Sequence, residues 1–229
     1  MTLPFDRIPA GICNCYLLRG EKTILIDGGA PGGLDAFKQG LQRLGVDPRE
    51  IQLILLTHGH ADHIACLDAI QQMSGAQVAV HQNDRAWVES GRPLLPPGQT
   101  TWGKIMIGLA KPLFKPAIAP VKVDLAFDDD GFSLAEYGIA GRVIFTPGHS
   151  PGSSCILLES GDVFVGDLAM NAWFLRLTPG LPVLADDMGQ VIAAWEKLLA
   201  LGVKTVHPAH GDSFAAEIIR REIERRMAG

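Results

Sequence analysis

Two kinds of apolar pattern alternate along the chain. Continuous apolar runs predict buried strands, whereas apolar positions that recur every three or four residues predict amphipathic helices. Strands that alternate with helices are typical of a layered α/β fold. The predicted strands are 12–18, 22–27, 52–57, 77–80, 142–146, 153–159, 162–165 and 204–206, and the predicted helices are 34–44, 62–73, 83–89, 187–200 and 215–227.

Residues 91–124 interrupt this alternation. Six prolines surround one apolar stretch, Trp102–Ala110. A long insertion in a compact domain is often a lid or a binding loop, and this stretch would equally suit a core helix or a homodimer contact. If the insertion is a cap, then Trp102, Met106 and Phe114 favour an apolar acyl or aromatic substrate.

The densest polar motif is Thr57–His63, which directly follows an apolar run that is interpreted as a buried strand. His58 and His60 are two residues apart, so their rings can point the same way. Asp62 and His63 begin the next predicted helix and form a second set. Surface histidines with a capping aspartate are the alternative, but so many ligand types at one strand-to-helix turn favour metal. Two sets of side chains predict two metal ions.

Further candidate groups stand at the ends of other predicted strands. Asp27 ends one strand beneath the motif, where we expect it to accept a hydrogen bond from a ligand imidazole or a backbone amide. Other strand ends present His149, Asp167 and His210. Because ligands gather at strand ends in layered α/β folds, we expect these groups to converge. The remaining histidines are interpreted as structural, namely His81 and His207.

The composition argues against several classes of partner and location. A formal net charge of -5 and the absence of a Lys/Arg block argue against nucleic-acid binding. The start of the chain lacks a secretory signal pattern, and no apolar run reaches the ~18 residues that cross a bilayer. We therefore expect a cytoplasmic protein without a membrane span.

The four cysteines lie in apolar neighbourhoods without the density of a disulfide scaffold. They are predicted to be small buried hydrophobes in a reducing compartment. Cys13 and Cys15 also have the spacing of a soft metal or redox pair, but on a strand core packing is the favoured interpretation.

The chain resembles the metallo-β-lactamase superfamily over nearly its whole length. The HxHxDH signature at 58–63 is followed, in the order of that family, by a histidine in a TPGHSPG turn (His149), an aspartate in a GD step (Asp167) and a histidine in an AHG step (His210). The resemblance implies a single domain over 1–229 with a four-layer αββα sandwich, a metal site at one edge, and the insertion at 91–124 as a candidate substrate cap.

The resemblance also implies the ligand assignment. His58, His60 and His149 would hold the first metal. The second would be held by Asp62, His63 and His210, with Asp167 bridging both. Imidazoles and carboxylates suit two zinc ions, with iron and manganese as alternatives. The implied reaction is hydrolysis of a small-molecule ester, thioester or lactone by a metal-bridging hydroxide, which Asp62 would orient as the catalytic residue.

Departures from individual subfamilies narrow the choice of substrate. The commonest zinc β-lactamases have Cys in place of Asp167 and a different residue at His63, which argues against β-lactams. The chain lacks the long extension of glyoxalase II after His210. Met170 replaces the tyrosine that acyl-homoserine lactonases carry, and is a candidate substrate contact.

Two other functions stay open. Thr57–Ile64 is similar to the motif of mononuclear iron persulfide dioxygenases, in which only two histidines and the aspartate hold iron. A metal-stabilised binding module without activity is the non-enzymatic alternative. Retention of Asp62 and Asp167 argues against it, because structural zinc sites are usually closed sets of four ligands.

Overall fold

The computed structural model describes residues 5–112, 118–175 and 180–227. The first sheet contains β1 Phe5–Ala10, β2 Cys13–Arg19, β3 Thr23–Ile26, β4 Ile51–Leu55, β5 Gln77–His81 and β6 Leu125–Phe127. The second contains β7 Phe132–Ser133, β8 Gly141–Phe145, β9 Ser154–Leu158, β10 Asp162–Gly166, β11 Thr205–Pro208 and β12 Phe214–Ala215. The α-helices are α1 Leu34–Leu44, α2 Ala61–Ile64, α3 Leu67–Ser74, α4 Arg85–Ser90, α5 Thr101–Ala110, α6 Met188–Ala200 and α7 Glu217–Met227. Short 3₁₀ helices span Pro48–Glu50 and Ala135–Tyr137.

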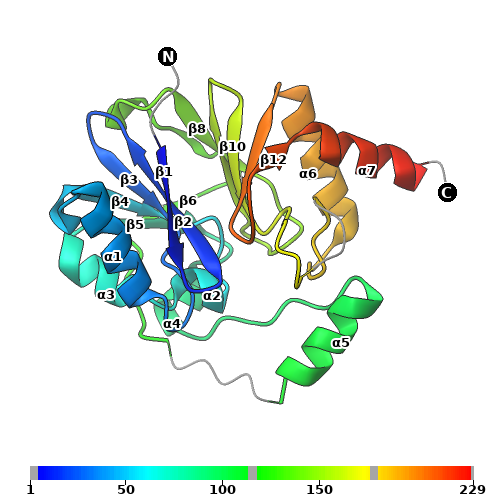
Figure 1. Ribbon diagram of the computed structural model, residues 1–229, viewed down its shortest axis with the longest axis horizontal. Helices are drawn as coiled ribbons and strands as arrows, with labels where there is room; N and C mark the ends of the chain where they lie inside the picture. The colour runs from blue at the N-terminus through cyan, green and yellow to red at the C-terminus, as the bar shows by residue number, and fades with distance from the viewer. Residues whose placement is uncertain (1–4, 113–117, 176–179, 228–229) are drawn as a thin grey trace.

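The two sheets pack face to face between helices, as Figure 1 shows. The strand orders are β1-β2-β3-β4-β5-β6 and β12-β11-β10-β9-β8-β7. Helices α1 and α3 cover the outer face of the first sheet, and α6 and α7 lie beside the second. The predicted four-layer αββα sandwich of two mixed sheets is therefore confirmed.

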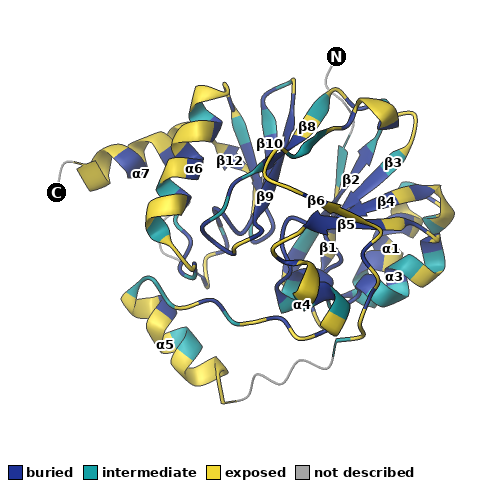
Figure 2. Cartoon of the chain, turned by 180° about the vertical axis from the view of Figure 1, so that it is seen from behind, coloured by how far each residue is buried: buried dark blue, intermediate teal, exposed yellow. Residues whose placement is uncertain are grey.

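Strand residues are buried on both faces of the first sheet (Figure 2). Ile24 and Leu53 pack in the cluster between the two sheets, whereas their neighbours Leu25 and Ile54 pack under the outer helices. Successive side chains of a strand point to opposite faces, so burial on both faces requires a continuous apolar run rather than an alternating one. In β3 and β4 the buried positions are accordingly all apolar, and the polar residues Thr23 and Gln52 are not buried.

The predicted helix 62–73 is wrong in one respect, because it is divided into α2 and α3. The backbone N–H groups of Ala65 and Cys66 donate to the carbonyls of Gly29 and Gly28, and Gly28 N–H donates to the carbonyl of His63. These bonds to the glycine loop replace helical ones and end the first helix after one turn. A Cβ on Gly28 would lie 3.0 Å from the His63 carbonyl oxygen, so close packing against the motif explains this glycine.

Parallel pairing directs several strand ends to one edge of the sandwich. β3, β4, β5 and β6 are mutually parallel, and so are β10 and β11. The carboxyl ends of parallel strands meet at the same edge of a sheet. The residues that follow β3, β4 and β10 include Asp27, the motif Thr57–His63 and Asp167.

The insertion contributes α5, which stands apart from both sheets in Figure 1 and is largely exposed in Figure 2. Its apolar stretch is thus a helix, with Leu109 71% exposed and Ile105 49% exposed. Residues 113–117, which include Phe114, lie outside the described residues.

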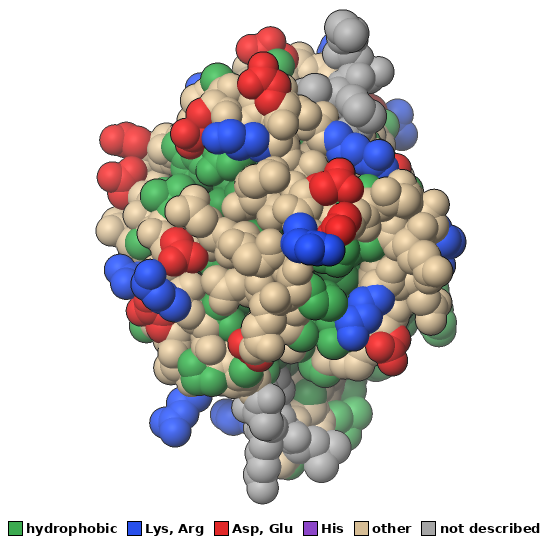
Figure 3. Space-filling model, turned by 90° about the vertical axis from the view of Figure 1, so that its left-hand side faces the viewer, with side chains coloured by type: hydrophobic (Ala, Val, Ile, Leu, Met, Phe, Trp, Pro, Cys, Tyr) green, Lys and Arg blue, Asp and Glu red, His purple; other side chains and the backbone are tan. Residues whose placement is uncertain are grey.

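On the face drawn in Figure 3, acidic and basic side chains are interspersed without a patch of one sign. Within the described ranges, no helix has both the length and the apolar character that crossing a membrane requires.

Candidate metal centre

All seven predicted ligands meet at one edge of the sandwich. The ligand atoms of His58, His60 and His149 lie within 4.8 Å of one another. A second group with the same spacing contains Asp62, His63 and His210, joined by a residue that the motifs did not indicate, Cys13. All seven histidines of the chain are buried.

In the first group the imidazoles are oriented by groups around them. His149 Nδ1 lies 2.9 Å from the carbonyl oxygen of Leu184, and His149 Nε2 lies 2.9 Å from His60 Nδ1. His58 Nδ1 lies 3.1 Å from Thr57 Oγ1. With its Nδ1 atom engaged, His58 presents Nε2 to the centre of the cluster.

In the second group the Nδ1 atoms are likewise engaged on the outside. His63 Nδ1 lies 2.9 Å from Asp27 Oδ2, and His210 Nδ1 lies 2.9 Å from the carbonyl oxygen of Ile12. His210 Nε2 is 3.0 Å from Asp62 Oδ2. Both Nε2 atoms therefore face inward, in the arrangement that metal-binding histidines usually have.

Asp167 lies between the two groups. Its Oδ1 atom is 3.3 Å from His63 Nε2 and from His210 Nε2, and its Oδ2 atom is 3.6 Å from His149 Nε2. Among the described residues, Asp167 Oδ1 and His58 Nε2 are buried and have no hydrogen-bond partner. Buried polar atoms normally have partners, so these atoms fit a site that holds cations.

The first group consists of imidazoles in the neutral form that binds metals. Burial, reinforced by neighbouring imidazoles, holds the pKa of His58 well below its usual value. Burial and the imidazole of His149 lower the pKa of His60 to about 3. Burial also lowers the pKa of His149.

The second group holds charge of both signs. Burial opposes protonation of His63 and His210, but the thiol of Cys13 and nearby carboxylates, led for His210 by Asp167, raise the pKa of both imidazoles well above the usual value. Burial likewise opposes ionisation of Asp62 and Asp167, yet the imidazoles lower the pKa of both carboxyl groups. Cations would replace the protons that otherwise neutralise this group.

The sequence led us to expect one of two contacts for Asp27, and the structure contains both. Besides His63, it accepts a hydrogen bond from Thr57 N–H (2.8 Å) and from Thr57 Oγ1. It thereby connects the end of β3 to the first residue of the motif.

A further acid, Asp84, was not singled out in the sequence. Its carboxylate accepts hydrogen bonds from Gly59 N–H (2.9 Å), Ser150 Oγ (2.7 Å) and Gly152 N–H (2.8 Å). Asp84 thus joins the turn that carries His58 and His60 to the turn that carries His149. The sequence offered one indication of this role, because Asp84 comes shortly after β5, whose carboxyl end lies at the same edge of the sheet.

A cavity of about 260 Å³ opens beside the cluster. Its lining includes ligands and an apolar wall: Ile12, Pro31, His60, Ala61, Asp62, Leu94, Leu95, Pro96, His149, Asp167 and Leu184. The predicted substrate contacts Trp102, Met106 and Met170 are not among these residues. Trp102 Nε1 donates to the carbonyl oxygen of Phe174, and Met170 is buried in an apolar cluster against which Met106 packs.

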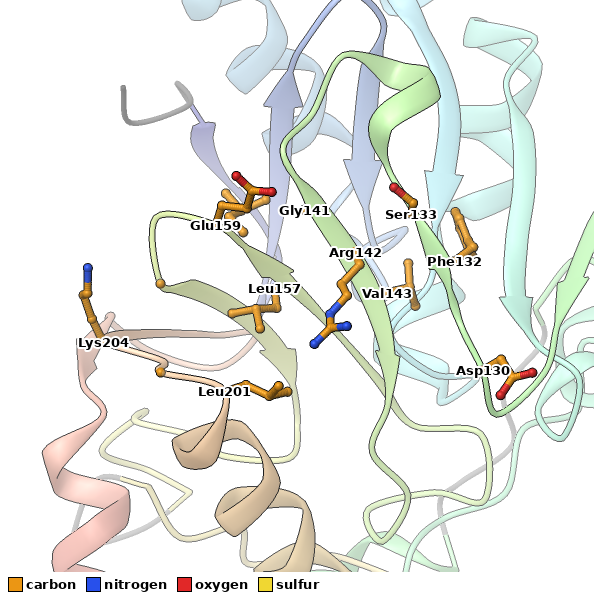
Figure 4. A pocket seen from close by; sticks show the side chains of 13 residues that line it. Asp130, Phe132, Ser133, Gly141, Arg142, Val143, Leu157, Glu159, Leu201 and Lys204 are labelled. Atoms are coloured by element: carbon orange, nitrogen blue, oxygen red, sulfur yellow. The ribbon is translucent and has the colours of Figure 1, made fainter.

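A larger cavity of about 550 Å³ lies on the second sheet, near the end of α6 (Figure 4). Arg142 and Lys204 line it together with Glu159 and Asp130. None of the seven predicted ligands lines this cavity, so it is separate from the metal cluster.

The two structural histidines have partners of their own. His81 Nε2 lies 3.1 Å from Asp129 Oδ1, and its ring stacks on Phe145. His207 lies between Asp162 Oδ1 (2.9 Å) and Ser213 Oγ (2.7 Å). Neither belongs to a candidate metal group within the described part of the chain.

Comparison with known proteins identifies one family. The profile described as Metallo-beta-lactamase superfamily matches residues 8–210. The metallo-beta-lactamase fold-containing protein ST1585 of Sulfurisphaera tokodaii is 27% identical over 96% of this chain and 83% of its own length. The probable metallo-hydrolase YqgX of Bacillus subtilis is 29% identical over 72% of this chain and 71% of its own.

Solved structures agree on the fold. The crystal structure of the archaeal superfamily protein ST1585 from Sulfolobus tokodaii has a TM-score of 0.72 at 23% identity, and the match covers 99% of this chain and 87% of that one. TTHA1623, solved in a di-iron-bound form, has a TM-score of 0.65 at 26% identity, with coverage of 94% and 97%.

Proposed function

From the premise that this chain belongs to the metallo-beta-lactamase superfamily, we propose that it is a dinuclear zinc hydrolase that cleaves an ester, thioester or lactone. The observation that carries the proposal is the inward convergence of five imidazoles and two carboxylates, with two buried atoms that lack hydrogen-bond partners. A set of this kind suits zinc, and iron and manganese are alternatives.

In this proposal the ligands divide as the two groups do. His58, His60 and His149 hold one ion, and Asp62, His63 and His210 hold the other, with Asp167 between them. When bound, the ions supply a nucleophile from water near neutral pH and polarise the substrate carbonyl.

Asp62 has the position of a catalytic carboxylate. It lies 3.0 Å from His210, and its side chain is 28% exposed and lines the 260 Å³ cavity. A carboxylate that is ionised and open to the cavity can accept a hydrogen bond from the attacking water and orient it. The neighbouring imidazoles keep its pKa low, so it stays ionised in that role.

The insertion supports an apolar substrate. Leu94, Leu95 and Pro96 form one wall of the cavity. Just beyond them, Gln99 N–H donates to the carbonyl of Val183 (2.8 Å) and Gln99 Nε2 donates to that of Ala185 (2.5 Å).

These two bonds flank Leu184, whose carbonyl contacts His149. Residues 94–99 are therefore held next to the segment that contacts His149, one of the predicted metal ligands. This position suits a cap that packs on the acyl part of a substrate.

The test is metal analysis followed by a substrate panel. Protein purified without added metal should contain close to two ions per chain, and should cleave at least one member of a panel of thioesters, lactones, aryl esters and a β-lactam. A protein that binds less than one ion and cleaves none of them contradicts the proposal. Oxygen consumption with glutathione persulfide, together with a single iron per chain, would instead identify a persulfide dioxygenase.

A further inference from the structure

Cys13 lies inside the second group of ligands, although the superfamily resemblance gave it no role. It is the first residue of β2 and is 1% exposed. Its Sγ atom is 3.6 Å from His63 Nε2, 3.9 Å from His63 Nδ1 and 4.0 Å from His210 Nε2. The thiol therefore lies against the ring of His63 and borders the space into which the two Nε2 atoms point.

The orientation of the imidazoles makes this placement informative. His63 Nδ1 is engaged by Asp27 and His210 Nδ1 by the carbonyl of Ile12, so each ring has only Nε2 for a ligand. Both Nε2 atoms converge on the same space, and Cys13 Sγ borders it. Asp167 is 6% exposed, and its Oδ1 atom lies 3.3 Å from the same two nitrogen atoms. This oxygen has no hydrogen-bond partner among the described residues.

The spacing matches ligands that share one ion. From zinc bond lengths, tetrahedral ligands are about 3.6 Å apart for a sulfur and a nitrogen, and about 3.4 Å apart for a nitrogen and an oxygen. The sulfur-to-nitrogen distances here are 3.6 and 4.0 Å, and His210 Nε2 is 3.0 Å from Asp62 Oδ2. The ligand atoms of Cys13, Asp62, His63 and His210 all lie within 4.8 Å of one another, which is the spacing of groups that can share one cation.

The backbone on both sides of Cys13 is attached to the turn that carries His210. On one side, the carbonyl oxygen of Ile12 lies 2.9 Å from Nδ1 of His210. On the other, Asn14 N–H donates to the carbonyl of Ala209 (2.7 Å) and Asn14 Nδ2 donates to that of Gly211 (2.8 Å). The backbone of Cys13 is therefore held beside the turn that carries His210.

We propose that the thiolate of Cys13 is a ligand of the second metal ion, together with Asp62, His63 and His210. The inference rests on the proposed function and deepens it. The thiol proton passes to solvent as the ion binds. With Asp167 between the two ions, the second ion would then have five protein ligands and the first would have four. The two ions would therefore differ, because only the second would be bound by sulfur.

The experiment uses cobalt(II) in place of zinc. Thiolate coordination gives cobalt a sulfur-to-metal charge-transfer band in the near ultraviolet, which imidazole and carboxylate ligands do not give. The wild-type protein loaded with cobalt should show this band, and C13A and C13S should lose it. Competition with a chromophoric chelator should show one of the two ions bound about 100-fold more weakly in both variants.

The matched control is C66A. Cys66 is also buried, but its Sγ donates to the carbonyl oxygen of Ala30 and it belongs to no candidate metal group. C66A should keep both the band and the affinity. Since C13S preserves the size of the side chain, it serves if C13A does not fold, and the wild-type spectrum reports sulfur coordination without any variant.

The outcomes separate the two proposals. Wild-type protein that binds two cobalt ions without the band, or a band that persists in C13A or C13S, overturns the thiolate ligand and leaves the hydrolase intact. Wild-type protein that binds no cobalt overturns both.

Discussion

Asp27 is the one residue other than glycine that has a positive φ, 65°, within the described ranges. A side chain in this region costs about 1 kcal/mol or more, and it persists where surrounding contacts require it. Here the carboxylate contacts His63 and Thr57 at once. The strain is thus explained by the orientation of a ligand imidazole.

We predict that Asp27→Asn weakens metal binding about 10- to 100-fold. Asparagine tolerates the left-handed backbone but removes the charge that orients His63. Chelator competition measures the loss. Asp162→Asn is the matched control, because Asp162 contacts His207 in a histidine–acid pair outside the cluster. Equal metal affinity in both variants would show that Asp27 has no such role.

His60→Ala should lower kcat/KM by at least about 100-fold on whichever substrate the panel identifies. The imidazole contacts His149 and borders the cavity, so its loss removes a ligand next to the substrate. His207→Gln, at a buried histidine outside the cluster, should retain turnover per folded molecule. Near-normal kinetics in His60→Ala would contradict both the hydrolase and the dioxygenase.

At the residue scale, polar residues in motifs at strand ends were predictable, whereas a cysteine within an apolar strand was not. The imidazoles of the motif Thr57–His63 stood out because several ligand types are adjacent in sequence. Asp84 was not singled out, and Cys13 was considered as part of a soft metal pair but interpreted as core, because the partners of both residues are far away in the sequence. A cysteine on an apolar strand is indistinguishable from core until the fold places His63 and His210 beside it.

At the scale of elements, Asp84 holds two turns together from the start of α4. Asp84→Ala should lower the free energy of unfolding by about 3 kcal/mol, because it leaves two backbone N–H groups and one hydroxyl buried without an acceptor. It should also weaken metal binding, since the turns carry His58, His60 and His149. Chemical denaturation and chelator competition measure the two effects.

The control for Asp84 is Asp187→Ala. Asp187 also accepts two backbone N–H groups, from Gly189 and Gln190 at the start of α6. Its loss should cost about 1 kcal/mol of stability and leave metal affinity unchanged. If both variants kept full metal affinity, Asp84 would be structural only.

Helix α7 provides an acid-sensitive contact. Hydrogen bonds from Arg225 and Arg226 lower the pKa of Glu222 below its usual 4.5, against the effect of burial. A lowered folded-state pKa stabilises the fold above the unfolded value, and this contribution is lost as the pH falls. Glu222→Gln should therefore cost about 0.5–1 kcal/mol at pH 7 and nothing in strong acid.

Urea titrations at several pH values measure the difference. Glu224→Gln, an exposed neighbour on the same helix, is the control. A constant difference between Glu222→Gln and the wild type from pH 7 down to pH 3 would rule out this pairing.

The helices of eleven residues or more were predicted well, whereas strand β1, which has six residues, was missed, as were the shortest strands. The helix at 34–44 was predicted with its observed bounds, because its apolar stripe repeats over three turns. β7 and β12 have two residues each, too few to show any periodicity. The break between α2 and α3 arises from tertiary bonds to Gly28 and Gly29, which local sequence does not encode.

At the scale of the molecule, the candidate ligands come from both sheets. The motif follows β4 of the first sheet, whereas His149, Asp167 and His210 follow strands of the second. Bound ions would therefore add to the apolar cluster and the hydrogen bonds, such as those of Asp84 and Asn14, that already join the two layers. The α/β class was predictable from the alternation of strands and helices, and the αββα sandwich from the family resemblance. The role of α5 was not predictable, since its apolar residues suit a cap and a dimer contact equally.

Removal of metal should lower the thermal midpoint. Ions present at about 1000 times their dissociation constant add about 4 kcal/mol, which shifts the midpoint by about 8–16 °C for a chain of this length. Calorimetry before and after treatment with a chelator measures the shift, and added zinc should reverse it. His60→Ala should respond less. Identical midpoints with and without metal would show that the cluster binds none.

The turn Asp128–Gly131 joins the two sheets, which are built from consecutive halves of the chain. If the polypeptide were opened there, each fragment would keep one sheet, part of the ligand set and an uncovered apolar face. Turnover would then require the two fragments to associate. Splitting the chain at this turn would therefore give a fragment-complementation reporter of protein association.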